Sequence, residues 1–226
     1  PRLVSLYQRS FDHLNVVSSK KLPDMSSHDA QIHMASLGRH FRSDADAFKR
    51  IRSPYLKADA QRTRSLRQQV ASTGKLVCGL SWFSKSDEFG EDKSLRLRDL
   101  TPVLQLPGLM FIDLQYGDTV AERAAVQAST GIEVRHIDAV DNFNDIDGLA
   151  ALIEACDVVV TVSNTTAHLA GALGKKVLIM VPCSFGLLWY WHVDRSDSPW
   201  YPGAKLFRQK VIGEWGDVVE AVRDEL

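Results

Sequence analysis

From residue 75 onward, short runs of apolar residues alternate with longer stretches in which apolar residues recur every three or four positions. The short runs are rich in Val, Ile and Leu, which is typical of strands buried on both faces, whereas the periodic stretches are typical of helices. This alternation predicts a parallel sheet with helices on both faces. The expected strands are Leu76–Trp82, Leu109–Leu114, Glu133–Ile137, Asp157–Val162, Lys176–Val181 and Ala204–Phe207.

Helices are expected in the gaps between these strands. Pro102 lies inside the first helix, and because proline removes a helix hydrogen bond, that helix is expected to be short or to begin late. Together the elements predict an α/β, Rossmann-like domain over residues 71–226. The expected helices are Leu97–Gln105, Thr119–Thr130, Asp145–Ala155, Thr166–Leu173 and Trp215–Glu225.

Residues 1–60 contain too little predicted sheet to bury a core of their own. The polar stretch from Ala60 to Gly74 is interpreted as the connection into the sheet domain. Because the chain starts at Pro1 without a methionine, we expect residues 1–70 to be a remnant of an upstream α/β domain plus a linker. The pattern there predicts helices at Arg2–Ser10 and Ala30–Leu37, a strand at Leu14–Ser18 and an extended turn at Ser53–Tyr55.

The composition is that of a globular protein, since 226 residues with 45% hydrophobic content can bury a sizeable core. Cys78, Cys156 and Cys183 are an odd number and widely spaced, so we expect reduced thiols and a cytoplasmic location. No apolar run reaches 18 residues and no charged-then-apolar leader is present. The sequence therefore predicts neither a membrane span nor a signal peptide.

The net charge of -1 conceals an uneven distribution. Residues 1–70 hold 13 Lys/Arg and 6 Asp/Glu, against 14 and 22 in the remainder. Such a basic segment is either solvated surface or a face that favours an acidic ligand or partner. The basic residues between positions 39 and 52 come without a recognisable nucleic-acid module, so no nucleic-acid partner is expected.

The clearest candidate for a ligand site follows the expected strand at Asp157–Val162. Small polar residues occur there at an expected helix N-terminus, where backbone N–H groups are left free. Side-chain donors and the helix dipole can therefore bind a phosphate jointly. The same residues can equally serve as a helix cap. Their position after a buried strand of an open α/β sheet favours a ligand. They are Ser163, Asn164, Thr165 and Thr166, followed by His168 in the helix.

A second candidate is the loop Phe83–Ser94, because loops at the carboxyl ends of parallel strands border the ligand crevice. It offers Ser84 and two lysines, Lys85 and Lys93, whose positive charge suits a phosphate. No carboxylate cluster with metal-ligand spacing is evident, so no metal is expected. Because four acidic residues lie in the same loop, the lysines can equally be ordinary solvated charges.

An aromatic stretch runs from Trp189 to Arg195 and is followed by Pro199–Pro202. Aromatic planes beside an arginine can stack on a sugar or a base, and they can equally pack an interdomain surface. Packing is favoured for Trp200 and Tyr201, whereas Trp189 and Arg195 stay open to either role.

Four motifs occur in the order found in one enzyme class: Gly79–Trp82, Leu114–Asp118, Asn164–Gly174 and Asp197–Pro202. Together they resemble those of GT-B glycosyltransferases. More closely, the chain is similar to bacterial tetratricopeptide-repeat proteins whose C-terminal part is related to lipopolysaccharide heptosyltransferases and protein O-GlcNAc transferases. The resemblance covers nearly everything from residue 71.

This resemblance implies that the domain binds a nucleotide diphosphate sugar, linked to UDP, ADP or GDP, and needs no cofactor. Related enzymes often have Asp-Thr where this chain has Ser163-Asn164, which removes a carboxylate. The catalytic base is expected on an absent N-terminal domain, and no residue of this chain is assigned that role. The donor contacts implied are Ser84, Lys85, Lys93, Gln115, Tyr116, Phe143, Asn144, Ser163, Asn164, Thr165, Thr166, His168, Trp189 and Arg195.

The leading hypothesis is therefore the donor-binding part of a glycosyltransferase that acts on a protein or glycan acceptor, with upstream repeats that bind protein. One alternative is a non-catalytic scaffold module of a repeat protein. The other is an epimerase-like enzyme acting on the nucleotide sugar itself, although no strong carboxylate pair supports it.

Overall fold

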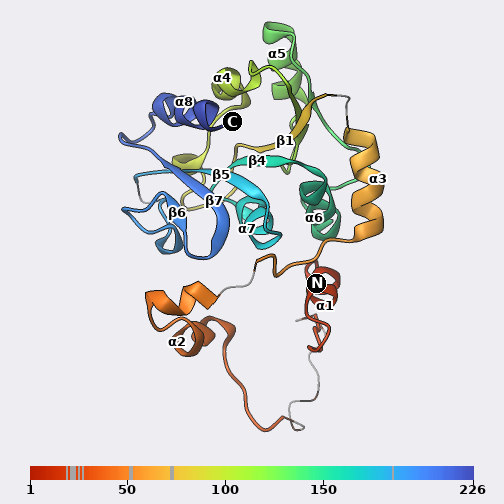
Figure 1. The fold of residues 1–226 in the computed structure, drawn as a ribbon, viewed down its shortest axis with the longest axis vertical. Coiled ribbons are helices and arrows are strands. Elements are labelled where there is room, and N and C mark those ends of the chain that lie inside the picture. Colours follow the sequence, from red (N-terminus) through yellow and green to blue (C-terminus); the bar gives the residue numbers. More distant parts are fainter. Residues whose placement is uncertain are drawn as a thin grey trace.

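The computed structural model describes residues 1–18, 20, 24, 26, 28–50, 53–71, 74–184 and 186–226. A seven-stranded sheet with the order β3-β2-β1-β4-β5-β7-β6 forms its centre (Figure 1). Every neighbouring pair is parallel except β6 and β7, which are antiparallel at one edge. The strands are β1 Leu76–Ser81, β2 Leu109–Asp113, β3 Val134–Arg135, β4 Val158–Val162, β5 Lys176–Val181, β6 Asp197–Ser198 and β7 Tyr201–Arg208.

Helices cover both faces of this sheet (Figure 1). On one face α4, α5 and α8 bury a core with Trp82, Phe111 and Met180, and on the other α3, α6 and α7 bury a second core with Ile112, Val159 and Ile179. The predicted Rossmann-like α/β fold is thus confirmed. The helices are α3 Ala60–Val70, α4 Thr101–Leu104, α5 Val120–Thr130, α6 Ile146–Ala155, α7 Thr165–Ala172 and α8 Gly216–Glu225.

The stretch Ala60–Gly74, interpreted as the connection into the sheet domain, contains a helix that was not predicted, α3 at residues 60–70. Asp59 caps this helix by accepting a hydrogen bond from the Arg62 amide at 2.7 Å. Of the helix residues only Leu66 and Val70 are buried, one turn apart. Its other exposed positions are polar, so the apolar periodicity is too sparse to predict a helix from sequence.

Two further predictions need correction. Leu14–Ser18 forms no strand, because the structure gives residues 15–18 no sheet partner. The helix predicted at Ala30–Leu37 begins later, as the 3-10 turn η2 Met34–Ser36 followed by α2 Leu37–Phe41.

The first predicted helix of the sheet domain is indeed short: the 3-10 helix η5 Leu97–Leu100 precedes Pro102, and α4 ends at Leu104. The strand β6 was not predicted, because two residues carry no periodicity.

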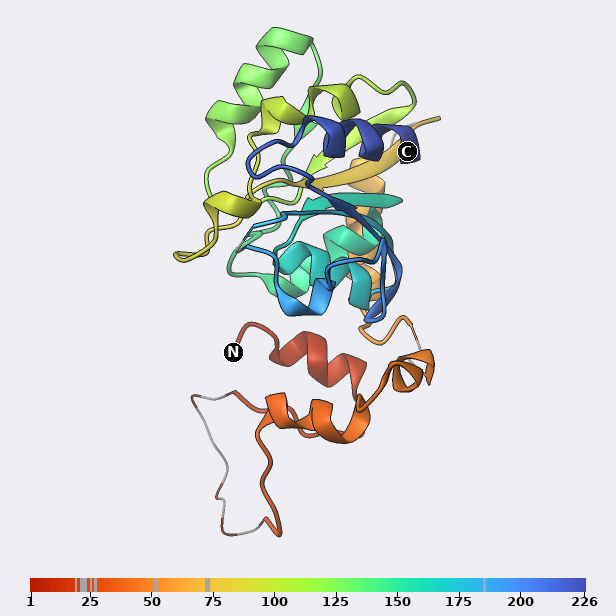
Figure 2. The same ribbon diagram turned by 90° about the vertical axis from the view of Figure 1, so that its left-hand side faces the viewer.

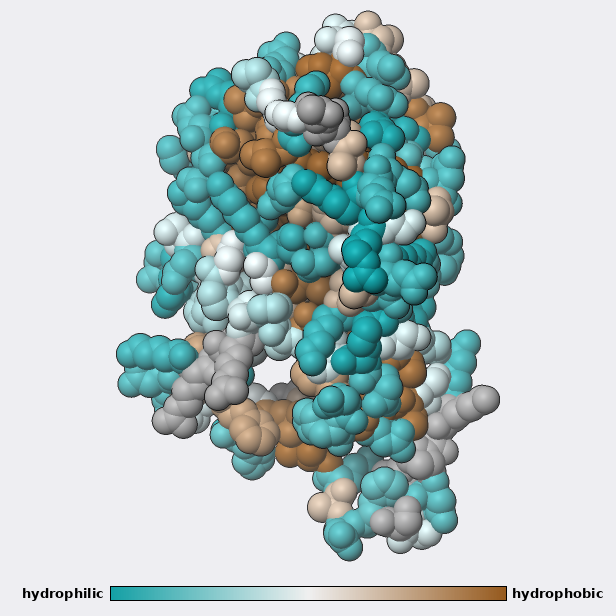
Figure 3. Space-filling model, turned by 45° about the vertical axis from the view of Figure 1, so that its right-hand side comes forward, coloured by the Kyte–Doolittle hydropathy of each residue, from teal (hydrophilic) through white to brown (hydrophobic). Residues whose placement is uncertain are grey.

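The N-terminal segment lies on the side of the sheet covered by α6 and α7 (Figure 2). Helix α1 Val4–Ser10 inserts Leu6 into the core, and the Arg9 guanidinium pairs with Asp147 at the start of α6. Beyond it, η2 and α2 leave the apolar side chains of Met34 and Phe41 at the surface, and the 3-10 helix η3 Ala45–Arg50 follows. Apolar surface is visible in the lower part of the molecule (Figure 3). That residues 1–70 are a remnant of an upstream domain plus a linker stays a prediction.

Close contact between α7 and β7 depends on Gly171. A Cβ atom at this position would overlap the ring of Tyr201. We therefore predict that Gly171→Ala lowers the free energy of unfolding by about 1–3 kcal/mol, the usual effect of overpacking a core. Urea unfolding measures this loss. Gly216→Ala at the start of α8, where a Cβ meets nothing within 4 Å, is the matched control and should leave stability nearly unchanged.

Candidate functional site

The carboxyl ends of β1 and β4 are joined by the buried side chain of Asn164. Its Oδ1 accepts hydrogen bonds from the amides of Thr166 at 2.9 Å and Ala167 at 3.4 Å, which caps α7. Its Nδ2 donates to Ser81 Oγ at 2.8 Å and to the Phe83 carbonyl at 3.2 Å. Asn164 therefore fixes the N-terminus of α7 against the loop that follows β1, and its amide is fully used within the protein.

Gln115 performs the corresponding task between β1 and β2. Its Oε1 accepts from Ser81 Oγ at 3.1 Å and from the amides of Trp82 and Phe83 at 3.0 and 2.9 Å. Its backbone is held by the buried carboxylate of Asp113, which accepts from the Gln115 amide at 2.8 Å. Gln115 is thus a positioning residue for the loop after β1.

His168 lies one turn into α7 inside a cluster of aromatic rings. Its Nδ1 is 2.8 Å from the hydroxyl of Tyr201, and its ring stacks on Trp191 at 5.2 Å with an interplanar angle of 13°. Tyr190 contacts the ring edge-on at 4.9 Å. Burial, reinforced by the charge of Lys93, lowers the pKa of His168 from 6.5 to about 4. The imidazole is therefore neutral at pH 7, and Nε2 is the ring nitrogen left for a ligand.

The other polar residues of this turn differ in accessibility. Ser163 is buried, and its Oγ accepts a hydrogen bond from Trp191 Nε1 at 2.8 Å. Thr166 is buried as well, whereas Thr165 is exposed at the first position of α7. Thr165 is thus the residue of the predicted turn that faces solvent.

Lys93 is the unusual charge of the site. It ends the 3-10 helix η4 Glu91–Lys93, and only 6% of its surface is exposed. Burial lowers the pKa of its ammonium group, and no carboxylate among the described residues lies within ion-pair distance to offset this. A buried cation without a counter-charge is unfavourable unless a ligand supplies one. The charge of Lys93 also acts on His168 of α7.

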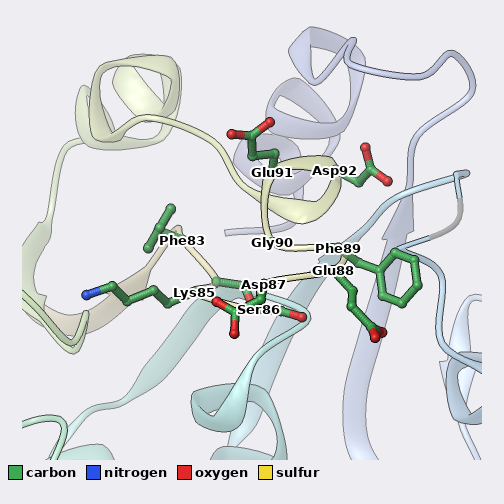
Figure 4. Close-up of a pocket in the computed structure, with 10 residues that line it drawn as sticks. Phe83, Lys85, Ser86, Asp87, Glu88, Phe89, Gly90, Glu91 and Asp92 are labelled. Atoms are coloured by element: carbon green, nitrogen blue, oxygen red, sulfur yellow. The ribbon is translucent and has the colours of Figure 1, made fainter.

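Lys85 occupies a different environment. The loop after β1 encloses a cavity of about 350 Å³, and Lys85 extends away from Glu88 and Phe89 there (Figure 4). Four carboxylates line the same cavity, those of Asp87, Glu88, Glu91 and Asp92. This acidic lining disfavours a diphosphate inside the loop. Ser84 is buried and its amide donates to Ser94 Oγ at 2.9 Å, so it stabilises the loop.

An aromatic row follows the ends of β1 and β2. Tyr116 lies between Phe83, at 6.4 Å between ring centroids, and Phe143, at 5.9 Å. Phe143 is 51% exposed, and the guanidinium of Arg2 lies 4.9 Å above its ring. Asn144 instead donates two hydrogen bonds to the carboxylate of Asp141, one from its backbone N–H and one from its side-chain Nδ2, each at 2.9 Å. The row offers ring faces for a planar group, whereas Asn144 stabilises the turn.

Trp189 and Arg195 lie on the far side of the aromatic cluster. Trp189 is 75% exposed and contacts Tyr190 and Trp200 edge-on, at 5.6 and 6.0 Å. Arg195 forms a bidentate ion pair with Asp197 of β6, at 2.9 and 2.7 Å. Its guanidinium thus pairs with β6, and the cavity it lines contains none of the other predicted donor contacts.

Several positioning residues were not predicted. Asp113 is fully buried and accepts from Thr119 Oγ1 at 2.5 Å, while Arg123 Nε and His136 Nδ1 lie 3.3 and 3.1 Å away. The signal available in the sequence was a carboxylate at the end of an otherwise apolar strand. The contacts of His168 with the rings of Tyr190, Trp191 and Tyr201 could not be predicted, because these residues are distant from His168 in the sequence.

In the part of the chain that the structure describes, no group of three or more His, Cys, Asp or Glu residues could hold a metal ion. Among the same residues, no helix is long and apolar enough to cross a membrane.

No protein-family model matches this chain. Among curated proteins, Protein FlbA of Caulobacter vibrioides is 29% identical over 244 residues, which cover 99% of this chain and 40% of FlbA. Among solved structures, the ADP-heptose lps heptosyltransferase II of E. coli aligns with a TM-score of 0.53 and 17% identity, covering 77% of this chain and 54% of that protein. A glycosyl transferase family 9 structure from Veillonella parvula aligns with a TM-score of 0.48 and 15% identity, over 75% of this chain and 51% of that one.

The likeness to the E. coli heptosyltransferase shows a shared fold. The chain spans less than half of FlbA and about half of the E. coli enzyme. The resemblance to tetratricopeptide-repeat proteins and to O-GlcNAc transferases stays a prediction.

The environment of His168 predicts a pH dependence of stability. Because its pKa is lower in the folded state than in the unfolded state, the unfolded chain binds the proton more tightly between about pH 6.5 and about 4. Stability should fall over this window as the pH is lowered, by up to about 3 kcal/mol. Urea unfolding at a series of pH values measures the slope. His168→Gln should show a shallower slope, and an identical slope in both proteins would contradict the assignment.

Proposed function

We propose that this chain is the donor-binding part of a GT-B glycosyltransferase and holds a nucleotide diphosphate sugar at the carboxyl ends of β1, β2 and β4. The observation that carries the proposal is the side chain of Lys93, which is 6% exposed, has no ion-pair partner among the described residues and carries a charge that acts on His168 of α7. A cation and the positive end of the α7 dipole, two features that favour an anion, are thus combined in one region. The shared fold supports the proposal.

The arrangement suits the departure of a diphosphate. In glycosyl transfer the acceptor oxygen attacks the anomeric carbon, the bond to the diphosphate oxygen breaks, and that oxygen keeps the electron pair. Lys93 would stabilise the developing negative charge, and the positive end of the α7 dipole would do the same. His168, neutral at pH 7, would donate or accept a hydrogen bond through Nε2 and contributes no charge.

The aromatic row would hold the nucleoside. Phe143 and Phe83 present partly exposed rings beside Tyr116, and a base can stack on such faces. UDP-, ADP- and GDP-linked sugars all have the required planar group and diphosphate. A base that takes the acceptor proton is assigned to no residue of this chain. Donor binding is therefore proposed for this chain, which spans 40% of FlbA. Transfer of the sugar is proposed only for a protein of the length of FlbA.

Calorimetric titration with UDP-glucose, ADP-glucose and GDP-glucose tests donor binding. We expect at least one to bind saturably, and Lys93→Met to weaken it at least tenfold, because a charged hydrogen bond contributes about 1.5–3 kcal/mol. Lys85→Met is the matched control and should change the affinity much less, since Lys85 is exposed in an acidic loop. If the folded wild-type chain bound none of the three, the scaffold alternative would be favoured.

The same variant should be more stable than the wild type without ligand. Methionine removes a charge that has no ion-pair partner among the described residues, and it keeps most of the side-chain volume. We therefore expect Lys93→Met to raise the free energy of unfolding by about 1 kcal/mol or more. Lys85→Met should leave it unchanged within about 0.5 kcal/mol. Thermal or urea unfolding measures both. A destabilised Lys93→Met would show that Lys93 has a structural partner, contrary to the proposal.

A further inference from the structure

The two ring nitrogens of His168 lie in different environments. Nδ1 is 2.8 Å from the hydroxyl of Tyr201, at the start of β7. Nε2 has no hydrogen-bond partner among the residues that the structure describes, and it is not one of their fully buried polar atoms. Because the residue as a whole is only half-buried, Nε2 is the nitrogen that solvent or a ligand can reach.

The neighbouring rings hold the imidazole in place. It stacks on Trp191 and meets the ring of Tyr201 edge-on, at 5.8 Å between centroids. Tyr201 is itself fixed, because its ring packs directly against Gly171 of α7. A half-turn of the imidazole would place a carbon opposite the Tyr201 hydroxyl and lose the hydrogen bond. The ring therefore keeps Nδ1 toward Tyr201.

The hydrogen bond between these two side chains can run in either direction, and their chemistry favours the hydroxyl as donor. A phenol is a stronger acid than the N–H of a neutral imidazole, and the bare imidazole nitrogen is a stronger base than the phenol oxygen. Burial lowers the pKa of His168 to about 4, so the ring carries one proton at pH 7. If Nδ1 accepts, that proton is on Nε2.

A second tyrosine supports the same direction. The hydroxyl of Tyr55 lies within hydrogen-bonding range of the Tyr201 hydroxyl, and the two rings stack at 6.5 Å with an interplanar angle of 23°. When Tyr201 donates to His168, its oxygen is free to accept from Tyr55. The order Tyr55 to Tyr201 to His168 thus uses both tyrosine protons, whereas the reverse order leaves the Tyr55 proton without an acceptor in this cluster.

We propose that Tyr201 is a positioning residue that fixes His168 in the tautomer with its proton on Nε2, so that the site presents an N–H donor to its ligand. Such a donor requires an oxygen that accepts, and an oxygen of a diphosphate does so without donating in return. The identity of this ligand oxygen rests on the proposed function. The tautomer does not, because it is a property of the chain without ligand.

Nuclear magnetic resonance of the chain labelled with 15N-histidine tests the tautomer directly, at pH 7 and without ligand. The signals of His168 are those that His168→Gln removes. We expect Nε2 to carry the proton and Nδ1 to have the shift of a bare nitrogen that accepts a hydrogen bond. A proton on Nδ1 would overturn the proposal.

Tyr201→Phe keeps the ring and removes the hydroxyl. A hydroxyl that donates to Nδ1 stabilises the neutral imidazole, so its removal should raise the pKa of His168 from about 4 toward 6.5, followed through the same signals. A hydroxyl that accepts would stabilise the cation, and the pKa would then fall. A lowered or unchanged pKa therefore contradicts the proposal. Tyr55→Phe is the matched control, since it leaves the Tyr201 proton in place and should change neither the tautomer nor, to a similar extent, the pKa.

Calorimetry connects this tautomer to the ligand. Tyr201→Phe should weaken the nucleotide sugar that the wild type binds by about two- to tenfold, the effect of one neutral hydrogen bond. An unchanged affinity would show that Tyr201 does not position His168 for the ligand. The two proposals fail separately: a wild-type chain that binds no nucleotide sugar overturns the proposed function, whereas a proton on Nδ1 overturns this one.

Discussion

Two buried side-chain amides hold the carboxyl edge of the sheet together. Asn164 caps α7 and bonds to Ser81 and Phe83, while Gln115 bonds to Ser81 and to the amides that follow it. Both residues act on the same few atoms at the end of β1. Because buried amides must be satisfied, any shift of β1 relative to β2 or β4 would leave several polar groups without partners. The loop after β1, which carries Lys93, is therefore fixed relative to α7.

This rigidity explains how the fold can retain a buried ammonium group. Lys93 would relax toward solvent or toward a carboxylate if its loop were free to move. Ser94 prevents such movement, because its Oγ accepts from the Ser84 amide and donates to the Gly90 carbonyl. The unfavourable charge is thus maintained by neighbouring hydrogen bonds, as is common where a protein prepares a site for a ligand of opposite charge.

Much of the sheet domain could be predicted, because its elements depend on local sequence. Continuous apolar runs gave β1, β2, β4 and β5 with small errors at the ends, and Asn164 and Asp145 are the caps that their types suggest. The polar helix α3 and the edge strand β6 could not be predicted in the same way. Each is stabilised by contacts distant in sequence, α3 through Leu66 and Val70 in the core and β6 through pairing with β7.

For the candidate site, the sequence determined which residues gather at the carboxyl ends of the strands, because the parallel topology brings those ends to one edge. The tertiary structure decided what each of them can do. It satisfies the amides of Asn164 and Gln115 internally and pairs Arg195 with Asp197. It leaves Lys93 buried without a counter-charge among the residues that the structure describes. It also surrounds His168 with Trp191 and Tyr201, which lie more than twenty residues away. Burial and pairing depend on contacts between distant segments, and no local pattern of residues encodes them.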